Sequence, residues 1–143
     1  MVERVLNTEK AAEEIAFIEK HCFSTPWSAE QIKSSGDSTV FFVAKEGGQT
    51  VGYAGMYTVL DEGYVTNIGV LPNHRKKGIG KALTESLIEY SISQKLSFLS
   101  LEVRVSNSAA IGLYTTLDFK EVGKRKNFYS NPKEDALIMT RYF

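Results

Sequence analysis

The chain has 143 residues, and its 17 basic and 17 acidic side chains leave no formal net charge. This balance excludes a general attraction to nucleic acid or to an anionic membrane surface, so direct binding to either is not expected. The length suits one domain with a proper core, and we expect a single domain over residues 1–143.

The chain has a single cysteine, Cys22, which excludes an internal disulfide and is typical of a reducing compartment. Its start lacks the pattern of a signal segment, and no apolar run approaches membrane-spanning length. The two histidines, His21 and His74, lie outside metal-ligand spacing from Cys22 or a carboxylate cluster. These patterns predict a cytoplasmic protein without a metal site.

The N-terminal segment predicts one short strand and two helices. Residues 2–6 form the strand, and Thr8 begins a helix whose apolar stripe consists of Ala12, Ile15, Ala16, Ile18 and Phe23. Ser28 and Gln31 form a capping box that starts a second, shorter helix, expected to end at residues 36–37.

Three strands follow. Residues 40–44 and 51–57 are expected to form a hairpin around Gly47 and Gly48, and residues 61–63 turn the chain again. The third strand covers residues 64–71, where Pro72 and Asn73 stop it.

A basic glycine loop and an amphipathic helix come after this third strand. The apolar face of the helix consists of Ile79, Ala82, Leu83, Leu87 and Tyr90. The next strand, residues 98–103, follows a helical crossover, so it should lie parallel to the strand over residues 64–71.

The C-terminal part predicts a short helix over residues 107–117, capped by Ser106, and two strands over residues 119–126 and 136–142. A turn at residues 130–133 joins these strands. Together the elements predict an α/β (α+β) fold with a mixed central sheet of about six to seven strands and about four flanking helices.

The basic loop has the features of a phosphate site. The first amides of a helix lack internal partners and lie at its positive end, where they bind anions. Gly78 and Gly80 let the backbone approach a ligand, and positive charge comes from Arg75, Lys76, Lys77 and Lys81. A phosphate or pyrophosphate is the expected ligand.

Two better-known phosphate loops do not fit. A Walker A loop needs glycine at position 75 and Ser or Thr at 82, where this chain has Arg75 and Ala82. A dinucleotide fingerprint needs a third small residue at 83, where Leu83 stands. A solvated basic turn that merely starts a helix is the alternative from the loop alone.

Glu102 interrupts an apolar strand. Leu99, Leu101 and Val103 share one face, and Ser100 and Glu102 share the other. The carboxyl end of a parallel strand is where open α/β sheets place ligands. Burial there would raise the pKa of Glu102 and suit it to accept a proton near neutral pH. The alternative is an ion pair with Arg104 or a lysine.

Two residues of the following helix, and one before the glycine loop, are further candidates. Asn107 could hydrogen-bond an amide-bearing ligand, and the phenol of Tyr114 could donate a proton, or could simply be a core residue. Glu62 is a second candidate acid or base, or a solvated turn carboxylate.

The order of these features resembles the GNAT family of acetyl-CoA-dependent N-acetyltransferases. The resemblance covers nearly the whole chain. It rests on the order of four features: the loop Arg75-x-x-Gly78-x-Gly80, the strand that carries Glu102, then Asn107, then Tyr114. Within the family it is similar to the RimI branch, bacterial enzymes that acetylate the N-terminal alanine of a small-subunit ribosomal protein. The segments that carry this similarity are Pro26-Trp27-Ser28, Asn67-Ile68-Gly69-Val70, Leu101-Glu102-Val103-Arg104, Ser106-Asn107, Arg125-x-Asn127-Phe128-Tyr129 and Glu134-Asp135-Ala136.

The resemblance implies a set of cofactor-binding residues. Backbone amides of Lys76, Lys77, Gly78, Ile79, Gly80 and Lys81 would hold the pyrophosphate of CoA, beside Arg75. Ile68, Gly69 and Val70 would hold the pantetheine arm and the thioester carbonyl, with a backbone N–H stabilising the oxyanion. Asn107 would contact the pantetheine.

The resemblance also implies the chemistry. Glu102 would take a proton from the attacking N-terminal amine, directly or through a water, and Tyr114 would protonate the departing thiolate. The amine would attack directly, without a covalent acyl-enzyme. The acceptor would be the N-terminus of a ribosomal protein. A second hypothesis keeps the enzyme but makes a lysine side chain or a small amine the acceptor. A third is a non-catalytic module that only senses CoA.

Departures from the family pattern lie near the acceptor. Gly69 stands where relatives commonly have alanine, and Phe128 where tyrosine is common. Trp27 either covers a pocket or fills the core. The sequence does not show whether Trp27 or residues 127–134 move when a ligand binds.

Overall fold

A mixed sheet forms the centre of the computed structural model, which describes residues 1–36 and 38–143. Within those residues the sheet has seven strands in the order β1-β2-β3-β4-β5-β7-β6, with four α-helices. The strands are β1 (Val2–Arg4), β2 (Thr39–Glu46), β3 (Gln49–Val59), β4 (Glu62–Val70), β5 (Phe98–Arg104), β6 (Lys120–Tyr129) and β7 (Glu134–Tyr142). The helices are α1 (Thr8–Cys22), α2 (Ala29–Ser35), α3 (Ile79–Ser93) and α4 (Ser108–Thr116), and a 3₁₀ turn η1 (Pro72–His74) follows β4. The predicted fold class is confirmed.

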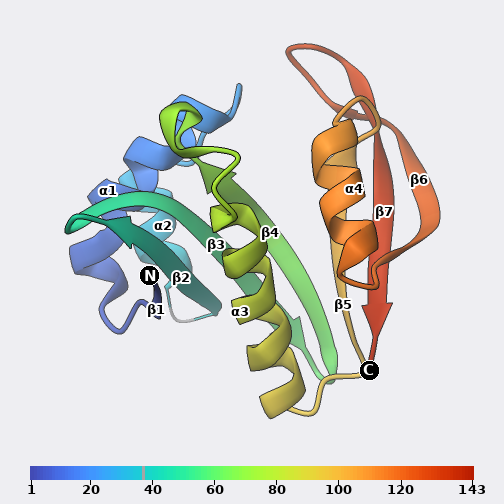
Figure 1. Cartoon of the computed structure of the whole chain (residues 1–143), viewed down its shortest axis with the longest axis horizontal. Coiled ribbons are helices and arrows are strands. Elements are labelled where there is room, and N and C mark those ends of the chain that lie inside the picture. The colour runs from blue at the N-terminus through green and yellow to red at the C-terminus, as the bar shows by residue number, and fades with distance from the viewer. Residues whose placement is uncertain (37) are drawn as a thin grey trace.

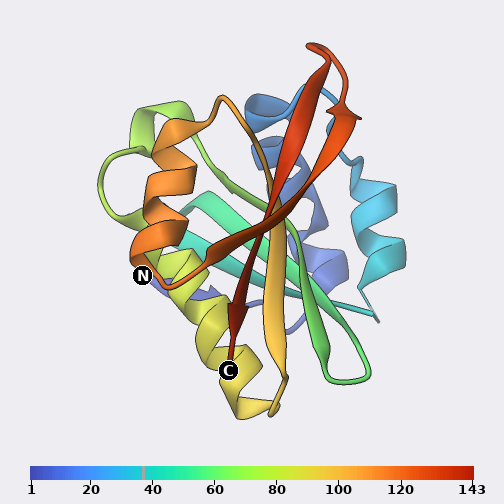
Figure 2. The ribbon, with the colours of Figure 1, turned by 90° about the vertical axis from the view of Figure 1, so that its right-hand side faces the viewer.

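The helices cover both faces of the sheet. Figure 2 shows α3 and α4 on one side and α1 and α2 on the other. The predicted apolar face of α3 is confirmed in part, since Leu83 and Leu87 are buried in the core with Leu99, Leu101 and Val103 of β5. Ile79, Ala82 and Tyr90 are only partly buried, and Thr84, Ile88 and Ser91 complete the buried face. No helix among the described residues combines the length and apolar character that crossing a membrane requires.

The two parallel strands pair only at one end. Residues 62–64 of β4 are in register with residues 98–100 of β5, and no further pairs join these strands in the described chain. Beyond that point β4 and β5 diverge, as Figure 1 shows. On the side of β5 away from β4, β7 pairs antiparallel with β5, and β6 pairs antiparallel with β7. The divergence opens the sheet beside the carboxyl end of β5.

Several local predictions are confirmed and two are corrected. The capping box of Ser28 and Gln31 is present, and Gly47 and Gly48 make their turn with positive φ. Glu62 and Gly63, predicted as a turn, are the first residues of β4. Asp37, expected at the end of α2, lies outside the described residues.

The cap of α4 is also different from the prediction. Asn107, rather than Ser106, caps this helix, because its side-chain oxygen accepts from the Ala110 N–H at 3.2 Å. The Ser106 N–H is instead bound by Glu134 at 2.7 Å.

Candidate active site

The backbone of β4 presents polar groups to the opening between the strands. The Leu71 N–H donates to Val51 of β3, whereas the Val70 carbonyl accepts from Arg75 Nε at 2.9 Å and from Cys22 Sγ at 3.3 Å, away from β3. Since backbone direction alternates along a strand, Ile68 faces the opening like Val70. Gly69 directs its backbone groups to β3.

The predicted cofactor residues gather along one groove of about 590 Å³ between β4, the glycine loop and α4. Its lining includes Ile68, Gly69, Val70, Arg75, Lys76, Gly78, Ile79, Gly80, Lys81 and Asn107. Lys77 is the exception, because its Nζ lies 3.5 Å from Glu46, whose other oxygen lies 3.1 Å from His74 Nδ1. The loop therefore contributes the backbone near Lys77 but turns that ammonium away.

The start of α3 is built to receive an anion. Gly78 takes a left-handed conformation, with φ of 83°, and offers no side-chain cap to the first amides of the helix. The first turn carries no acidic residue. A Cβ at Gly80 would meet only Leu113, at 3.7 Å, so the groove comes close to the backbone at this position.

Glu102 and Tyr114 both line a second cavity of about 260 Å³ that adjoins the groove. Tyr114 lines the groove as well, which places it at the junction of the two. It is buried, and burial, with a smaller contribution from Tyr129, raises the pKa of its phenol to about 12. Tyr114 therefore stays protonated at neutral pH.

The burial considered for Glu102 is not found, and the alternative of an ion pair holds with a different partner. The Glu102 side chain is 32% exposed, and Oε2 lies 3.3 Å from Arg125 Nε, an ion pair with neither of the partners considered from the sequence. The reason is that β6, two strands away, brings Arg125 over the open part of the sheet. Glu62, the second candidate, accepts from the Tyr64 hydroxyl at 2.6 Å and shares a third cavity with Glu102.

The entrance to the second cavity lies between two loops. A further cavity of about 460 Å³ is lined by Ser24 and Thr25 after α1 and by residues of the β6–β7 turn. Ser24 Oγ donates to the Ser130 carbonyl at 3.3 Å, so the loops touch across the entrance. Phe128, 49% exposed, lines both cavities. These two cavities together could admit an extended chain end.

Sequence reasoning missed a buried carboxylate beside this site. Glu19 of α1 is fully buried and accepts from Tyr53 Oη at 2.7 Å, from the Trp27 N–H at 2.9 Å and from Asn67 Nδ2 at 3.2 Å. Burial raises its pKa, against the hydrogen bonds. Asn67 lines the second cavity and the cavity between the two loops, together called the acceptor-side cavities below. The signal in the sequence is a carboxylate adjoining Ile18 within the apolar stripe.

Three residues of the segments similar to the RimI branch also lie near this site: Trp27, Arg104 and Tyr129. Trp27 packs against the hydrophobic core, as the second interpretation of this residue predicted. Arg104 and Tyr129 line both acceptor-side cavities. Burial raises the pKa of Tyr129 to about 12, and the nearby Glu102 adds to this.

Comparison with known proteins identifies the family. The model of the acetyltransferase (GNAT) family matches residues 6–119. The [ribosomal protein bS18]-alanine N-acetyltransferase of Escherichia coli strain K12 is 38% identical over 85% of this chain and 84% of its own. The enzyme of the same description from Haemophilus influenzae is 38% identical over 87% and 88%.

A solved structure agrees over almost the whole chain. The crystal structure of the ribosomal-protein-S18-alanine N-acetyltransferase from Escherichia coli superimposes with a TM-score of 0.89 at 34% identity. The match covers 99% of this chain and 94% of the other. The chain therefore belongs to the GNAT acetyltransferase family and is an N-acetyltransferase.

Proposed function

We propose that this enzyme transfers the acetyl group of acetyl-CoA to the α-amine of an N-terminal alanine, and that the acceptor is ribosomal protein bS18. The observation that supports this most directly is the continuity of the groove and the second cavity, with Tyr114 at their junction and Glu102 on the acceptor side. The relatives named above, which match this chain over 85% and 87% of its length, act on that acceptor by description.

Acetyl-CoA fits the groove by chemistry. The uncapped amides at the start of α3 suit its pyrophosphate, and the open space over Gly80 lets phosphate oxygens approach them. Asn107 keeps its side-chain NH₂ for the pantetheine amide, because only its oxygen is used in capping α4. The Ile68 and Val70 N–H groups face the opening, where one of them would stabilise the oxyanion.

Glu102 acts as the base. An N-terminal ammonium has a pKa of about 7.7–8.0, so the proton to be removed is weakly held. The partial exposure of Glu102 leaves room for a water to carry that proton to the carboxylate. The ion pair with Arg125 holds the carboxylate beside the second cavity.

Tyr114 acts as the acid toward the departing sulfur. Its high pKa keeps the phenol protonated until a strong base forms beside it. The same lack of water raises the pKa of a thiol leaving next to Tyr114, so the departing thiolate is a stronger base toward the phenol than it would be in water.

Direct attack by the amine fits the chemistry of the site. Cys22 lines the groove and both cavities, but burial raises the pKa of its thiol, which donates to the Val70 carbonyl. Such a thiol is a poor nucleophile at neutral pH. The acetyl group therefore passes directly to the amine, without a covalent acyl-enzyme.

An acceptor comparison tests the proposal. Peptides with the N-terminal sequence of bS18 are offered with acetyl-CoA, beside the same peptides blocked at the α-amine and beside lysine-containing and small amines. Acetylation of the unblocked peptide alone is expected. Transfer to blocked peptides at lysine, or to small amines only, would replace the N-terminal acceptor with one of these. Mass spectrometry of cellular N-termini with and without the protein then checks the acceptor and the cytoplasmic setting that we predict.

A further inference from the structure

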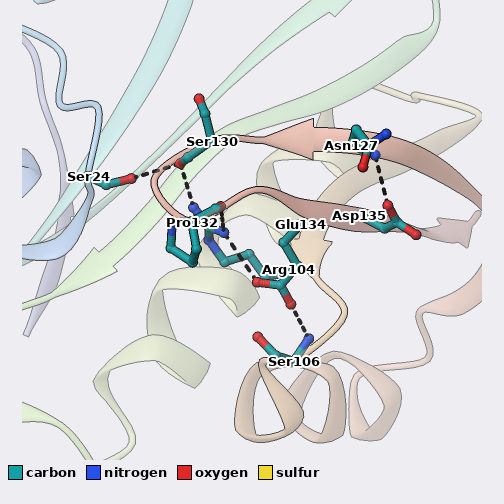
Figure 3. Close-up of polar contacts among 8 residues, drawn as sticks. All are labelled: Ser24, Arg104, Ser106, Asn127, Ser130, Pro132, Glu134 and Asp135. Carbon is teal, nitrogen blue, oxygen red and sulfur yellow. Dashed lines mark hydrogen bonds and ion pairs between the residues drawn. The ribbon is translucent and has the colours of Figure 1, made fainter.

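Arg104 makes an unusual number of contacts to one exposed turn. From the end of β5 its Nη1 donates to the Pro132 carbonyl at 2.8 Å, and its Nη2 donates to the Ser130 carbonyl at 3.2 Å. Figure 3 shows the guanidinium reaching into the turn between β6 and β7. Residues 130–133 are all exposed, so the turn has no apolar anchor of its own. The Arg104 guanidinium, a charged group with forked donors, therefore binds two carbonyls of the turn.

Glu134 orients this guanidinium. Its Oε1 lies 3.2 Å from Arg104 Nη1, and its Oε2 accepts the Ser106 N–H at 2.7 Å. The side chains of Arg104 and Glu134 are only 25% and 15% exposed. Hydrogen bonds from Ser106, and then Arg104, lower the pKa of Glu134, so it stays charged. Glu134 thus connects the turn to the residue that precedes Asn107.

The turn forms one wall of the acceptor entrance. The Arg104 guanidinium lies 4.4 Å from the centroid of the Tyr129 ring, which lines both acceptor-side cavities. The Ser130 carbonyl, already bound by Arg104, also accepts from Ser24 on the opposite loop. Arg104 therefore sets the position of Tyr129 and of the contact that spans the entrance.

We propose that Arg104, oriented by Glu134, is a positioning residue for the acceptor, since its hydrogen bonds to Ser130 and Pro132 hold the β6–β7 turn as a preformed wall of the acceptor entrance. The inference rests on the proposed function for what enters there. Without the Arg104 guanidinium, the turn would have to become ordered when the acceptor binds. The entropy lost in that ordering weakens acceptor binding and leaves the acetyl-CoA groove intact.

Arginine is required for geometric reasons. Its planar group presents donors toward two carbonyls and a carboxylate at once, which a lysine ammonium on a flexible stem does less well. Arg104→Met removes the donors and keeps the stem, and Arg104→Lys keeps the charge. Arg141→Met is a matched control, because Arg141 lies at the opposite end of β7 from this turn and donates to the Leu117 carbonyl at 3.2 Å.

The experiment measures three quantities for each variant. These are KM and kcat for an alanine-terminated bS18 peptide, the Kd of acetyl-CoA by calorimetry, and amide hydrogen exchange across residues 128–133. For Arg104→Met we expect an acceptor KM raised at least about tenfold, with kcat and the acetyl-CoA Kd within about twofold, and faster exchange in the turn. Arg104→Lys should lie between this variant and the wild type, and Arg141→Met should match the wild type.

An unchanged acceptor KM in Arg104→Met would overturn the proposal. So would a parallel loss of acetyl-CoA affinity and thermal stability, which would make Arg104 a general structural residue. If Arg104→Met does not fold, the KM and turn exchange of Arg104→Lys decide the matter. If the wild type acetylates no N-terminal peptide, the proposed function fails, and unchanged turn exchange in the Arg104 variants would separately refute the holding of the turn.

Discussion

Glu102 Oε2 lies 3.3 Å from Arg125 Nε, although Glu102 is on β5, Arg125 is on β6 and β7 runs between them. The Arg125 side chain is 58% exposed, so the pair adds little to stability. Its consequence is one of orientation, since it fixes the carboxylate where the second and third cavities meet at Glu102. Position, rather than burial, is what makes Glu102 the candidate base.

Replacing this carboxylate tests its role. Glu102→Gln keeps the size of the side chain and removes the proton acceptor, so we expect kcat to fall by about 10²–10⁴-fold. Acetyl-CoA affinity, measured by calorimetry, should stay unchanged because Glu102 lies outside the groove lining. Glu85→Gln on the exposed side of α3 is the control. Unchanged turnover with every acceptor would remove Glu102 from the mechanism.

The phenol of Tyr114 gives a second prediction. Tyr114→Phe retains the packing against Phe119, whose ring centroid is 5.8 Å away, and loses only the hydroxyl. We expect kcat to fall by about 10²-fold or more and the Kd of acetyl-CoA to change by less than about threefold. Tyr90→Phe, a half-buried tyrosine of α3, controls for loss of a phenol elsewhere. Equal losses in kcat and in affinity would make Tyr114 a packing residue.

Gly80→Glu should abolish acetyl-CoA binding without unfolding the protein. A Cβ fits at this helical position, with its nearest contact at 3.7 Å, but the carboxylate would occupy and repel the phosphate position. Gly112→Glu places the same side chain on an exposed glycine of α4, where a Cβ meets nothing within 4 Å. Calorimetry and melting curves of both variants decide the matter. Retained affinity in Gly80→Glu would move the pyrophosphate elsewhere.

Glu19 predicts a pH dependence of stability. Burial raises its pKa above the ordinary 4.5, so the folded state binds more protons than the unfolded state above that pH. The stability that Glu19 contributes is therefore fully present below pH 4.5 and is lost as the pH rises through the raised pKa. Glu19→Gln cannot titrate. The free energy of unfolding of the wild type relative to this variant should thus fall as the pH rises.

Denaturant unfolding of both proteins across this pH range measures the effect. Other carboxylates contribute equally to both proteins and cancel in the difference. Each unit by which the pKa is raised corresponds to about 1.4 kcal/mol. A difference that stays constant with pH would show that Glu19 has the same pKa in the folded and unfolded states.

The patterns that predicted the fold depend on interactions between residues close together in the chain. The capping box of Ser28 and Gln31 closes within one turn, and the apolar period of α3 needs only the two faces of a helix. The glycine loop belongs to the same class, because Gly78 at φ of 83° and the start of α3 are adjacent in the chain. These features brought most of the predicted cofactor residues to one groove.

What the sequence by itself determined is therefore the order of the elements, the glycine loop and the chemical types of the candidate acid and base. Tertiary structure decided the partner of Glu102, the turning of Lys77 toward Glu46, and the holding of an exposed turn by Arg104. Each of these contacts joins residues 23 to 31 positions apart. They depend on which strands and loops lie beside one another in the sheet, and no periodicity within one element encodes that.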